Sequence, residues 1–548
     1  MTGVTQYTQS ARFYCPISTC FGSSRCCYIR VHLAGSTEAL TTGKIFTCKY
    51  CGSTLEEDAT CRTLSDKCII HVISPESLTS KTWIGNHQLW TRHQAVPIYV
   101  RDEMSKQLEL GGLYKITLFH FLDGCIGSDE ISSSTPVFEI TISLPTGKYT
   151  YSSLPDSIIT LYEDRRESPW SFASSIAYCF GMPIAHPGSF LHLKMGLLMS
   201  LVLAEQIDND TIRGIDIMVI GHDLLTIQRL LMYGASFAKS LVMHSSVCDL
   251  VASVTRDPFG TGTFLINAGS MLLASKGLCL MTNISALRKE QKEKLRRVME
   301  NRGETIEIPK KFTECTQHLL VPIKTTAWAC SEPLQTAPKW GVTELWDQSL
   351  TLEPKQSAGA ALQGLTNRFA LVFSLADGEA ENQNYNDNLA LQRAMKDDDN
   401  EESGYISEDH MKQFLQFVSQ RPIKFGESPQ KLIQSFYLAG RRARNSQGDF
   451  PLSSLQTIAS MAAAHAKLSL RDQVIDEDVV VAVLMFDNSL RISHGYSLLG
   501  LRQDFLNAQS IMSVENDIKM KEYQKILYNF CSNYKSYSSP FTSNRREE

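Results

Sequence analysis

The sequence predicts a multidomain α+β protein, with a small β-barrel first, an α/β layer next and helices after it. The first 150 residues contain short segments in which apolar and polar residues alternate, which is the period of half-buried strands. From about Ser168 onward, longer apolar helices alternate with buried strands. At 548 residues the chain is too long for one ordinary core, and about 100 to 200 residues per domain gives three or four units.

Composition narrows the class of protein. A hydrophobic fraction of 43% and a charged fraction of 20% are near globular averages, so a folded chain is expected. The net charge of −5 provides no overall basic field, so any contact with DNA must come from a local patch. The apolar stretch Met195–Ala204 is shorter than the roughly 18 residues that span a bilayer, and residues 1–11 are polar. We expect a cytosolic or nuclear protein without membrane contacts, whose 15 cysteines are thiols or metal ligands.

Three strand patterns define the first predicted domain, residues 1–150. Val137–Leu144 alternates between apolar and polar residues, and Ile98–Val100 and Tyr114–Phe119 have similar patterns. Gly111 and Gly112 supply a turn between these elements. This part of the chain is predicted to be a small β-barrel.

The second predicted domain, residues 151–380, is an α/β layer. Its buried strands include Ile215–Ile220 and Gly277–Met281, and its sheet should be mostly parallel. Residues 381–408 are polar and acidic and are interpreted as a linker, because they hold few of the apolar residues that a core needs.

Residues 409–495 are predicted to form a helical domain, followed by a C-terminal tail over residues 496–548. Leu452–Lys467 carries apolar residues at helical spacing. In the next predicted helix, Asp476 is expected to be the N-cap, with Val480 placed for a hydrophobic staple.

Two cysteine pairs near the start of the chain have the spacing of a zinc ribbon. Four residues separate Cys15 from Cys20, two separate Cys48 from Cys51, and 27 residues lie between the pairs. In a zinc ribbon each cysteine pair lies on a β-turn, called a knuckle, and two knuckles converge to place four thiolates around one zinc ion. Gly52 suits the turn that directs backbone N–H groups toward the sulfurs. A closed set of four cysteines leaves no open position for a substrate, so the predicted zinc is structural.

Other assignments of the cysteines remain open at this point. Cys48 and Cys51 are also compatible with a surface redox pair, and Cys61 and Cys68 compete for one knuckle. We prefer Cys15 and Cys20 because the two pairs then flank a β-segment, Cys27–His32.

Several segments resemble the minichromosome-maintenance (MCM) family, and they occur in the family's order. They are Pro97-Ile-Tyr-Val-Arg-Asp-Glu with Leu110-Gly-Gly-Leu-Tyr-Lys-Ile-Thr, the stretch from Asp257 to Gly277, Leu365-Thr-Asn-Arg-Phe-Ala-Leu-Val-Phe373, and Ala464-His-Ala-Lys-Leu-Ser-Leu-Arg471. The resemblance implies an oligonucleotide-binding (OB) type barrel carrying the zinc ribbon, a degenerate AAA+ α/β core and a helical AAA+ lid. It also implies a nuclear protein that contacts DNA.

The stretch that corresponds to the family's phosphate-binding loop, Gly221-His-Asp-Leu-Leu-Thr-Ile-Gln, has lost the residues that its chemistry needs. Phosphoryl transfer on such a loop requires a Lys on the phosphates and a Ser or Thr hydroxyl on Mg²⁺. Gly221 is kept, but Ile227 stands at the lysine position and Gln228 at the hydroxyl position. Leu224 stands where the family's phosphate-binding loop has its second glycine.

The acidic pair that holds Mg²⁺ and polarises water should follow the strand at residues 277–281. Thr282 and Asn283 stand there instead, and neither can act as a carboxylate base. Glu332 stands at the family's sensor asparagine and Ser453 at the lid's sensor arginine. We therefore predict a pseudo-ATPase with no catalytic residues of its own, and ATP is not expected as a cofactor.

Arginines at two places in the sequence are candidates for contacts with a partner subunit or with phosphate. Arg368 corresponds to the family's arginine finger, which would serve a partner's site or an interface; the alternative is an ordinary ion-paired arginine. Arg441, Arg442 and Arg444 form a short basic cluster that could touch phosphate, although a solvated helix face is the commoner interpretation.

The sequence keeps the order of the MCM segments but not the catalytic residues. In this respect it resembles a divergent, meiotic MCM-like family more than the replicative MCM subunits. That resemblance implies a non-catalytic, DNA-associated scaffold in meiotic recombination and homologous-recombination repair of double-strand breaks, with other MCM-like subunits or recombination factors as partners. An active ATP-dependent DNA helicase subunit and a plain zinc-ribbon nucleic-acid-binding module are the alternatives. Because the zinc ribbon comes so early in the chain, we expect either a truncated N-terminus or an incomplete barrel.

Overall fold

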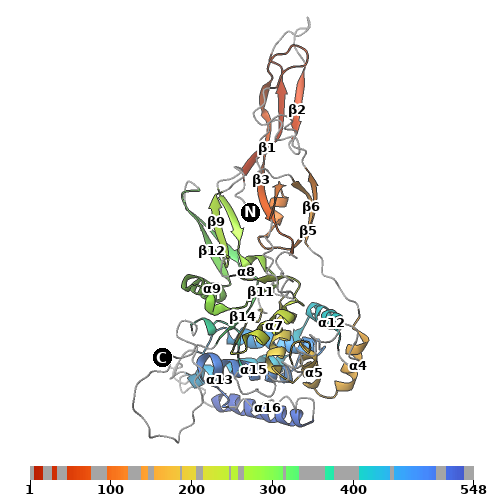
Figure 1. Ribbon diagram of the computed structural model, residues 1–548, viewed down its shortest axis with the longest axis vertical. Helices are drawn as coiled ribbons and strands as arrows, with labels where there is room; N and C mark the ends of the chain where they lie inside the picture. Colours follow the sequence, from red (N-terminus) through yellow and green to blue (C-terminus); the bar gives the residue numbers. More distant parts are fainter. Residues whose placement is uncertain are drawn as a thin grey trace, which may run out of the picture. The chain divides into compact units, whose positions relative to one another are not determined.

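The computed structural model divides into two compact units, each considered by itself (Figure 1). The first comprises residues 1–148, 251–273 and 305–321, and the second comprises residues 149–250, 274–304 and 322–548. The structure describes residues 5–16, 28–33, 46–75, 95–120, 138–145, 153–185, 188–204, 214–245, 248–256, 264–312, 316–332, 364–375, 406–444, 450–500 and 514–535.

The first unit contains a six-stranded sheet. Its strands are β1 (Thr5–Tyr14), β2 (Ile29–Leu33), β3 (Glu56–Val72), β4 (Val96–Arg101), β5 (Tyr114–His120) and β6 (Phe138–Pro145), in the order β2-β1-β3-β4-β6-β5. All neighbours are antiparallel except β4 and β6. The long strand β3 pairs with β1 over its first part and with β4 over its last part. It therefore joins the β2-β1 side of the sheet to the β4-β6-β5 side.

These strands confirm the three strand patterns expected in the first 150 residues. Among the described residues, β2 and β5 stand at the two ends of the sheet, so closure into an OB-type barrel stays a prediction. Gly111 provides the turn before β5 with a φ of +80°. A Cβ atom on Gly111 would lie 1.6 Å from the carbonyl oxygen of Leu272, in helix α8 (Ser270–Leu273), so only glycine fits there.

Two further strand pairs and one short helix accompany this sheet. They are β9 (Ala252–Arg256) with β10 (Phe264–Ala268), β12 (Gly303–Ile308) with β13 (Gln317–Pro322), and helix α3 (Met104–Gln107). The pair β9–β10 is antiparallel.

The second unit is built on a five-stranded parallel sheet, as the sequence predicts. The strands are β15 (Leu371–Leu375), β7 (Ile217–Gly221), β14 (Thr326–Ser331), β11 (Leu278–Met281) and β8 (Leu241–Met243), in that order. Every residue of β7, β14 and β11 is buried, because helices cover both faces of a parallel sheet. This burial explains why the central strands are continuous apolar runs rather than alternating patterns.

Helices pack closely on this sheet (Figure 1). Helices α6 (Leu191–Leu203) and α7 (Leu224–Ala235) and the 3₁₀ helix η2 (Ile284–Ala286) contact its strands. Helix α5 (Ser171–Cys179) packs on α6, and α4 (Asp156–Arg165) packs on α5. Helix α9 (Lys289–Asn301) follows η2 in the chain. Ser200 connects α6 to the sheet: its hydroxyl donates to the carbonyl of Ile215 at 2.7 Å and accepts from Nε1 of Trp328 at 2.8 Å. No helix among the described residues combines the length and apolarity that crossing a membrane requires.

The C-terminal part of the second unit is helical. Its elements are α12 (Glu408–Gln420), β16 (Lys424–Phe425), α13 (Glu427–Arg444), α14 (Ser454–Leu468), β17 (Gln473–Val474), α15 (Asp476–His494) and α16 (Val514–Lys535). Helix α14 confirms the helical spacing seen in the sequence at 452–467. The expected acidic linker lies almost entirely outside the described residues, which resume at Ile406.

Helix α16 lies where the sequence analysis expected a C-terminal tail, and for residues 514–535 that expectation was wrong. Its buried residues recur at helical spacing: Met520, Tyr523, Leu527 and Cys531 are each at most 4% exposed. The same periodicity was present in the sequence, and it identifies a packed amphipathic helix.

The N-cap of α15 is Ile475 rather than Asp476, which corrects the sequence prediction by one residue. Asp478, at the third helical position, accepts a hydrogen bond from the backbone N–H of Ile475 at 3.0 Å, and so provides the cap. Asp476 is used differently, because its carboxylate accepts from the hydroxyls of Ser428 and Tyr528 at 2.7 and 2.9 Å. Tertiary contacts thus determine which of the two neighbouring aspartates, Asp476 or Asp478, caps α15.

Candidate functional site

Three of the four predicted zinc ligands meet at the end of β1. The Sγ atoms of Cys15, Cys48 and Cys51 all lie within 4.8 Å of one another, and Cys15 Sγ is 3.5 Å from Cys51 Sγ. Cys15 and Cys48 are buried, whereas Cys51 is exposed. Three sulfurs at this separation could hold a metal ion.

The turn that carries Cys48 and Cys51 has the local geometry that a metal knuckle needs. Gly52 has a φ of +72°, and its N–H donates to the carbonyl of Cys48 at 2.9 Å. The N–H of Tyr50 points at the Sγ of Cys48 at 3.4 Å, which would stabilise a thiolate there. The glycine turn predicted from the sequence is therefore present.

Cys20 lies outside the described residues. Its two competitors among the described residues do not join the cluster: Cys61 donates from its Sγ to Asp58 Oδ2 at 3.4 Å, and Cys68 packs among buried residues of β3 and β4. Burial raises the pKa of the Cys68 thiol to about 11, which makes it a core residue rather than a ready metal ligand.

The residues of the predicted degenerate nucleotide site gather at the carboxyl ends of β7 and β11. Gly221 ends β7, and α7 begins at Leu224 after only two intervening residues. One of these, Asp223, is the N-cap of α7, because its carboxylate accepts from the backbone N–H of Thr226 at 3.1 Å. The sequence analysis missed this cap, although an aspartate just before an apolar helix was a signal for it.

Ile227 packs onto the backbone of the loop. Its side chain is 2% exposed, and a Cβ atom added to Gly221 would lie 2.6 Å from Ile227 Cδ1. The side chain of Ile227, the residue predicted to stand at the lysine position, therefore belongs to the hydrophobic core and lies against Gly221.

The remaining polar residues of this site are engaged in local contacts. Gln228 donates from Nε2 to the carbonyl of Thr282 at 2.9 Å, which joins α7 to the end of β11. The side chain of Asn283 accepts from the N–H of Ser285 at 3.0 Å and so caps η2. The structure thus brings Gly221, Ile227, Gln228 and Thr282 together.

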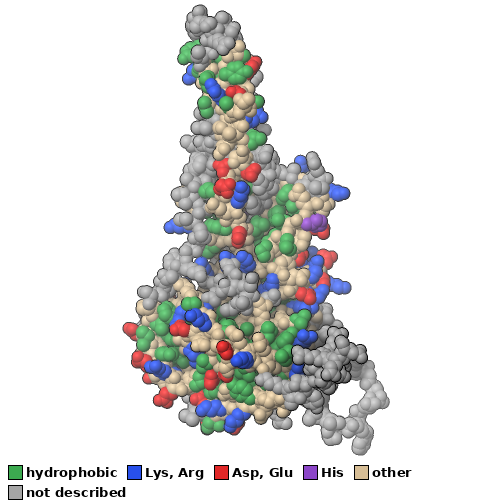
Figure 2. Space-filling model, turned by 180° about the vertical axis from the view of Figure 1, so that it is seen from behind, with side chains coloured by type: hydrophobic (Ala, Val, Ile, Leu, Met, Phe, Trp, Pro, Cys, Tyr) green, Lys and Arg blue, Asp and Glu red, His purple; other side chains and the backbone are tan. Residues whose placement is uncertain are grey.

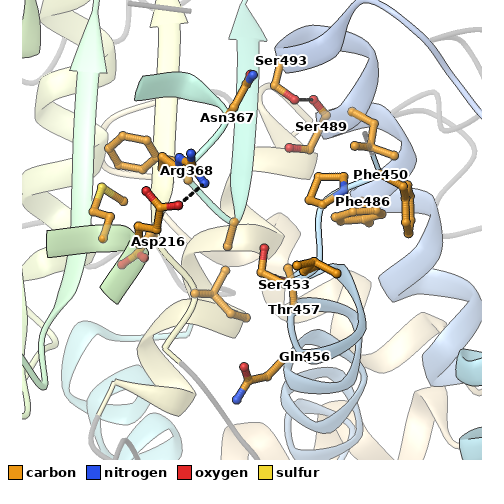
Figure 3. A pocket seen from close by; sticks show the side chains of 18 of the residues that line it. Asp216, Asn367, Arg368, Phe450, Ser453, Gln456, Thr457, Phe486, Ser489 and Ser493 are labelled. Atoms are coloured by element: carbon orange, nitrogen blue, oxygen red, sulfur yellow. Dashed lines mark hydrogen bonds and ion pairs between the residues drawn. The ribbon is translucent and has the colours of Figure 1, made fainter. Parts of the chain in front are cut away.

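A cavity of about 860 Å³ lies elsewhere in the second unit, between the sheet and the C-terminal helices (Figure 3). Its lining includes Asp216, Glu300, Arg302, Asn367, Arg368, Arg441, Arg444, Phe450, Ser453, Gln456, Thr457, Phe486, Ser489 and Ser493. Both Arg368 and Ser453, which were expected at the family's finger and lid-sensor positions, line it.

Arg368 is ion-paired and partly exposed. Its guanidinium lies 3.3 Å from the carboxylate of Glu300, and its side chain is 37% exposed. The basic cluster of α13 divides into two groups: Arg442 donates to the carbonyl of Tyr534 in α16, whereas Arg441 and Arg444 line the cavity. That division was not visible in the sequence.

The surface has no single sign of charge on the face shown in Figure 2. Lys and Arg side chains are interspersed there with Asp and Glu among the described residues, in keeping with the net charge of −5. Any contact with a polyanion would therefore depend on a local group of cations rather than on a broad basic face.

Comparison with known proteins finds sequences similar to this chain. The family model described as the MCM P-loop domain matches residues 189–390. Human minichromosome maintenance domain-containing protein 2 is 27% identical over 561 residues, covering 99% of this chain and 80% of the relative. The Rattus norvegicus protein of the same name is 29% identical, covering 90% of this chain and 72% of the relative.

A probable DNA helicase MCM9 of Arabidopsis thaliana is 25% identical over 42% of this chain and 34% of its own length. The loop from Gly221, the five-stranded parallel sheet and Arg368 all fall within the stretch matched by the family model. The chain is thus similar to minichromosome maintenance domain-containing protein 2 over nearly its whole length, and its parallel-sheet region matches the MCM P-loop domain.

Proposed function

We propose that this chain is a non-catalytic MCM-like protein of the nucleus, which acts as a DNA-associated scaffold in meiotic recombination and homologous-recombination repair of double-strand breaks. The observation that carries the non-catalytic part is the pairing of Asp223 with the N-terminus of α7. A helix N-terminus binds phosphate through its N–H groups and its positive dipole end. In this chain a carboxylate of the protein already uses one of those N–H groups.

The surroundings of Asp223 support the same conclusion. A fixed negative charge at the head of α7 repels phosphate, and the lysine that would offset it is replaced by the buried Ile227. Where a carboxylate pair would hold Mg²⁺, Thr282 offers its carbonyl to Gln228, and Asn283 caps η2. These contacts within the protein stabilise the loop.

The cysteine cluster supports a structural zinc site in the first unit. Cys15, Cys48 and Cys51 would supply three thiolates, with Cys20 as the proposed fourth ligand. Zinc bound in this way would hold the end of β1 and the 48–51 turn together as part of an OB-type barrel. The four cysteines would leave no position for a substrate.

A nucleotide titration of the full chain, with and without Mg²⁺, tests the non-catalytic proposal. We expect no tightening by Mg²⁺ and no steady turnover, because neither the phosphate lysine nor the metal carboxylates are in place. Tight Mg²⁺-dependent binding with continuous release of phosphate would overturn the proposal and favour the helicase alternative.

The meiotic and scaffolding part needs an experiment in cells. Affinity isolation from meiotic cells is expected to recover other MCM-like subunits or recombination factors. Arg368→Ala should weaken that recovery, whereas Lys431→Ala, which removes an exposed cation paired with Glu427 on the same unit, should leave it unchanged. Recovery of neither class of partner, together with normal crossover formation in cells that lack the protein, would refute this part.

A further inference from the structure

Ser428 belongs to a sequence motif that none of the features above uses. Serine or threonine precedes proline at five places in the sequence: Ser74, Thr135, Ser168, Ser428 and Ser539. Proline-directed protein kinases transfer phosphate to such residues, and those of the cyclin-dependent class favour a lysine or arginine three positions after the serine. Of the five places, only Ser428-Pro-Gln-Lys431 provides that cation.

The serine and the lysine of this motif are both accessible to an enzyme. Ser428 lies in the first turn of α13 and is exposed, and the Lys431 side chain is 75% exposed. Lys431 pairs with Glu427 at 3.3 Å, and an exposed pair of this kind contributes little to stability. The lysine is therefore available for recognition by a kinase.

The first turn of α13 can open locally at low cost. The first N–H groups of a helix have no partner within it, and Pro429 has no N–H. The N–H of Gln430 reaches the carbonyl of Gly426 at 3.4 Å, which is longer than a typical hydrogen bond. Kinases bind their substrates in extended form, and Pro429 is buried in the closed turn, so we expect modification to follow this opening.

Ser428 also lies where three helices meet. Its hydroxyl donates to Oδ2 of Asp476 at 2.7 Å, and the hydroxyl of Tyr528 donates to the same oxygen at 2.9 Å. Asp476 is the first residue of α15, and Tyr528 is in α16. One carboxylate oxygen thus links the start of α13, the start of α15 and α16. We call these three residues the Asp476 junction.

Among the residues that the structure describes, no cation pairs with the Asp476 carboxylate. Its bonds come from two neutral hydroxyls, and its other oxygen, Oδ1, is buried without a hydrogen-bond partner there. Glu427 and Glu477 adjoin Ser428 and Asp476 in the chain and add negative charge. Burial, and then the hydrogen bond to Asp476, raise the pKa of Tyr528 to about 12, so its phenol keeps its proton at neutral pH.

A phosphate on Ser428 would turn this attractive contact into a repulsive one. The serine hydroxyl supplies the proton of the hydrogen bond, whereas a phosphoserine carries a charge of about −1.5 to −2 at neutral pH and three acceptor oxygens. Two neighbouring anions without a cation between them repel, so the starts of α13 and α15 would separate. The positive N-terminal end of α13 attracts the phosphate, which keeps the helix itself formed.

We propose that Ser428 is a phosphorylation site for a proline-directed serine/threonine kinase, and that the phosphate opens the Asp476 junction. In the reaction, Oγ of Ser428 attacks the γ-phosphorus of ATP and the bond from that phosphorus to the β-phosphate oxygen breaks. The hydroxyl proton is released and ADP leaves. The modification controls the contact among α13, α15 and α16; it goes beyond the scaffold proposed above and does not rest on it.

Treatment of the full chain with a cyclin-dependent kinase and Mg²⁺-ATP, followed by mass spectrometry, tests the site. We expect phosphate on Ser428 and none there in Ser428→Ala. Lys431→Gln should slow the modification about fivefold, which corresponds to about 1 kcal/mol for an exposed charge contact. Ser168 is the internal control, because its hydroxyl donates to Asp517 at 2.7 Å and no cation stands three positions after it.

An unmodified chain, or phosphate on Ser168 and not on Ser428, would overturn the site. An unchanged rate in Lys431→Gln would overturn recognition through this motif. Neither result depends on nucleotide binding by the chain itself, so either would leave the non-catalytic scaffold untouched.

Hydrogen exchange of the phosphorylated and unmodified chains tests the consequence. Exchange at the start of α13, in β16 and β17, and around Tyr528 should rise about tenfold, because the loss of a hydrogen bond to a charged group corresponds to at least about 1.4 kcal/mol. The turns of α16 that carry Met520 and Leu527 are anchored in the core and should exchange as before. Ser428→Ala removes the hydrogen bond without adding charge and should give a smaller rise.

Asp476→Asn separates repulsion between charges from other effects of the phosphate. The neutral amide can donate to the phosphate, so phosphorylation should no longer raise exchange in this variant. The matched control is Asp472→Asn, which removes a carboxylate bound by Arg421 just before β17 and should respond as the unchanged chain does. Equal exchange in the modified and unmodified chains, or a rise that persists in Asp476→Asn, would refute the opening of the junction.

Discussion

Asp216 and Arg302 form an ion pair at the amino end of β7, 86 residues apart in sequence. The Asp216 side chain is 1% exposed and also accepts from the backbone N–H of Ala327 at 2.8 Å. Arg302 donates in addition to the carbonyl of Thr325 at 3.0 Å. One carboxylate and one guanidinium therefore connect β7, β14 and the end of α9.

Removing this guanidinium should destabilise the second unit strongly. Arg302→Ala leaves the buried carboxylate of Asp216 without its cation, and we expect a loss of about 3 to 5 kcal/mol in the free energy of unfolding. Urea denaturation measures it. Arg296→Ala, at an exposed pair with Glu293 on the same helix, should cost less than about 1 kcal/mol; equal losses in the two variants would contradict the importance of the buried pair.

Restoring the missing lysine should not restore an ATPase. Ile227→Lys introduces a charge at a site that is 2% exposed, so we expect the free energy of unfolding to fall by about 3 kcal/mol or more. Leu225→Lys, two residues earlier and 57% exposed, should change it by less than about 0.5 kcal/mol. Phosphate release should stay at background in both variants, because no carboxylate pair follows β11; turnover in Ile227→Lys would show that the site is more intact than we infer.

Asp223 should matter for stability rather than for catalysis. Asp223→Ala removes the N-cap of α7 and is expected to cost about 1 kcal/mol, whereas Asp223→Ser keeps an acceptor and should cost clearly less. Chemical denaturation of the three proteins gives the comparison. If alanine and serine were equivalent, the hydrogen bond to Thr226 would not be what stabilises the helix.

Metal analysis tests the cysteine cluster. We expect about one zinc per chain, lost when Cys48 and Cys51 are changed to serine, and bound more weakly as pH falls because the ligands must be thiolates. Cys68→Ser is the control: it should keep the metal, since that thiol lies apart from the cluster in the core. A metal-free chain, or metal that survives the double change, would rule out this site.

A buried lysine should make stability depend on pH. Burial lowers the pKa of Lys194 from 10.5 to about 7, so the unfolded chain holds its proton more tightly than the folded chain does. The free energy of unfolding should therefore decrease as pH falls from 10.5 to about 7, and this contribution should level off below that.

Lys194→Met should remove this slope and stabilise the protein at neutral pH by an amount on the order of a few kcal/mol. Unfolding measured between pH 6 and 10 provides the test. Lys431→Met, at a side chain 75% exposed on α13, should keep the slope of the unchanged chain. Parallel curves for Lys194→Met and the unchanged chain would show that Lys194 titrates normally.

The amino-acid sequence by itself determined the α/β class and its parallel sheet. A strand covered on both faces must be apolar at every position, and Ile217–Gly221 and Leu278–Met281 have that pattern. The sequence also predicted that residues 227, 282 and 283 do not support the family's nucleotide chemistry, because that chemistry is tied to residue type and spacing. The helix at 514–535 had a readable period, but the sequence analysis did not use it.

Only the tertiary structure decided which side chains meet. Cys15 joins Cys48 and Cys51 because the end of β1 and the 48–51 turn lie together, whereas Cys68 is within β3 and lies in the core. Arg302, Arg368 and Arg441 come from segments more than 60 residues apart and converge only because a sheet edge and α13 enclose one cavity. Such long-range contacts depend on packing across elements, and local patterns of polarity carry no information about them.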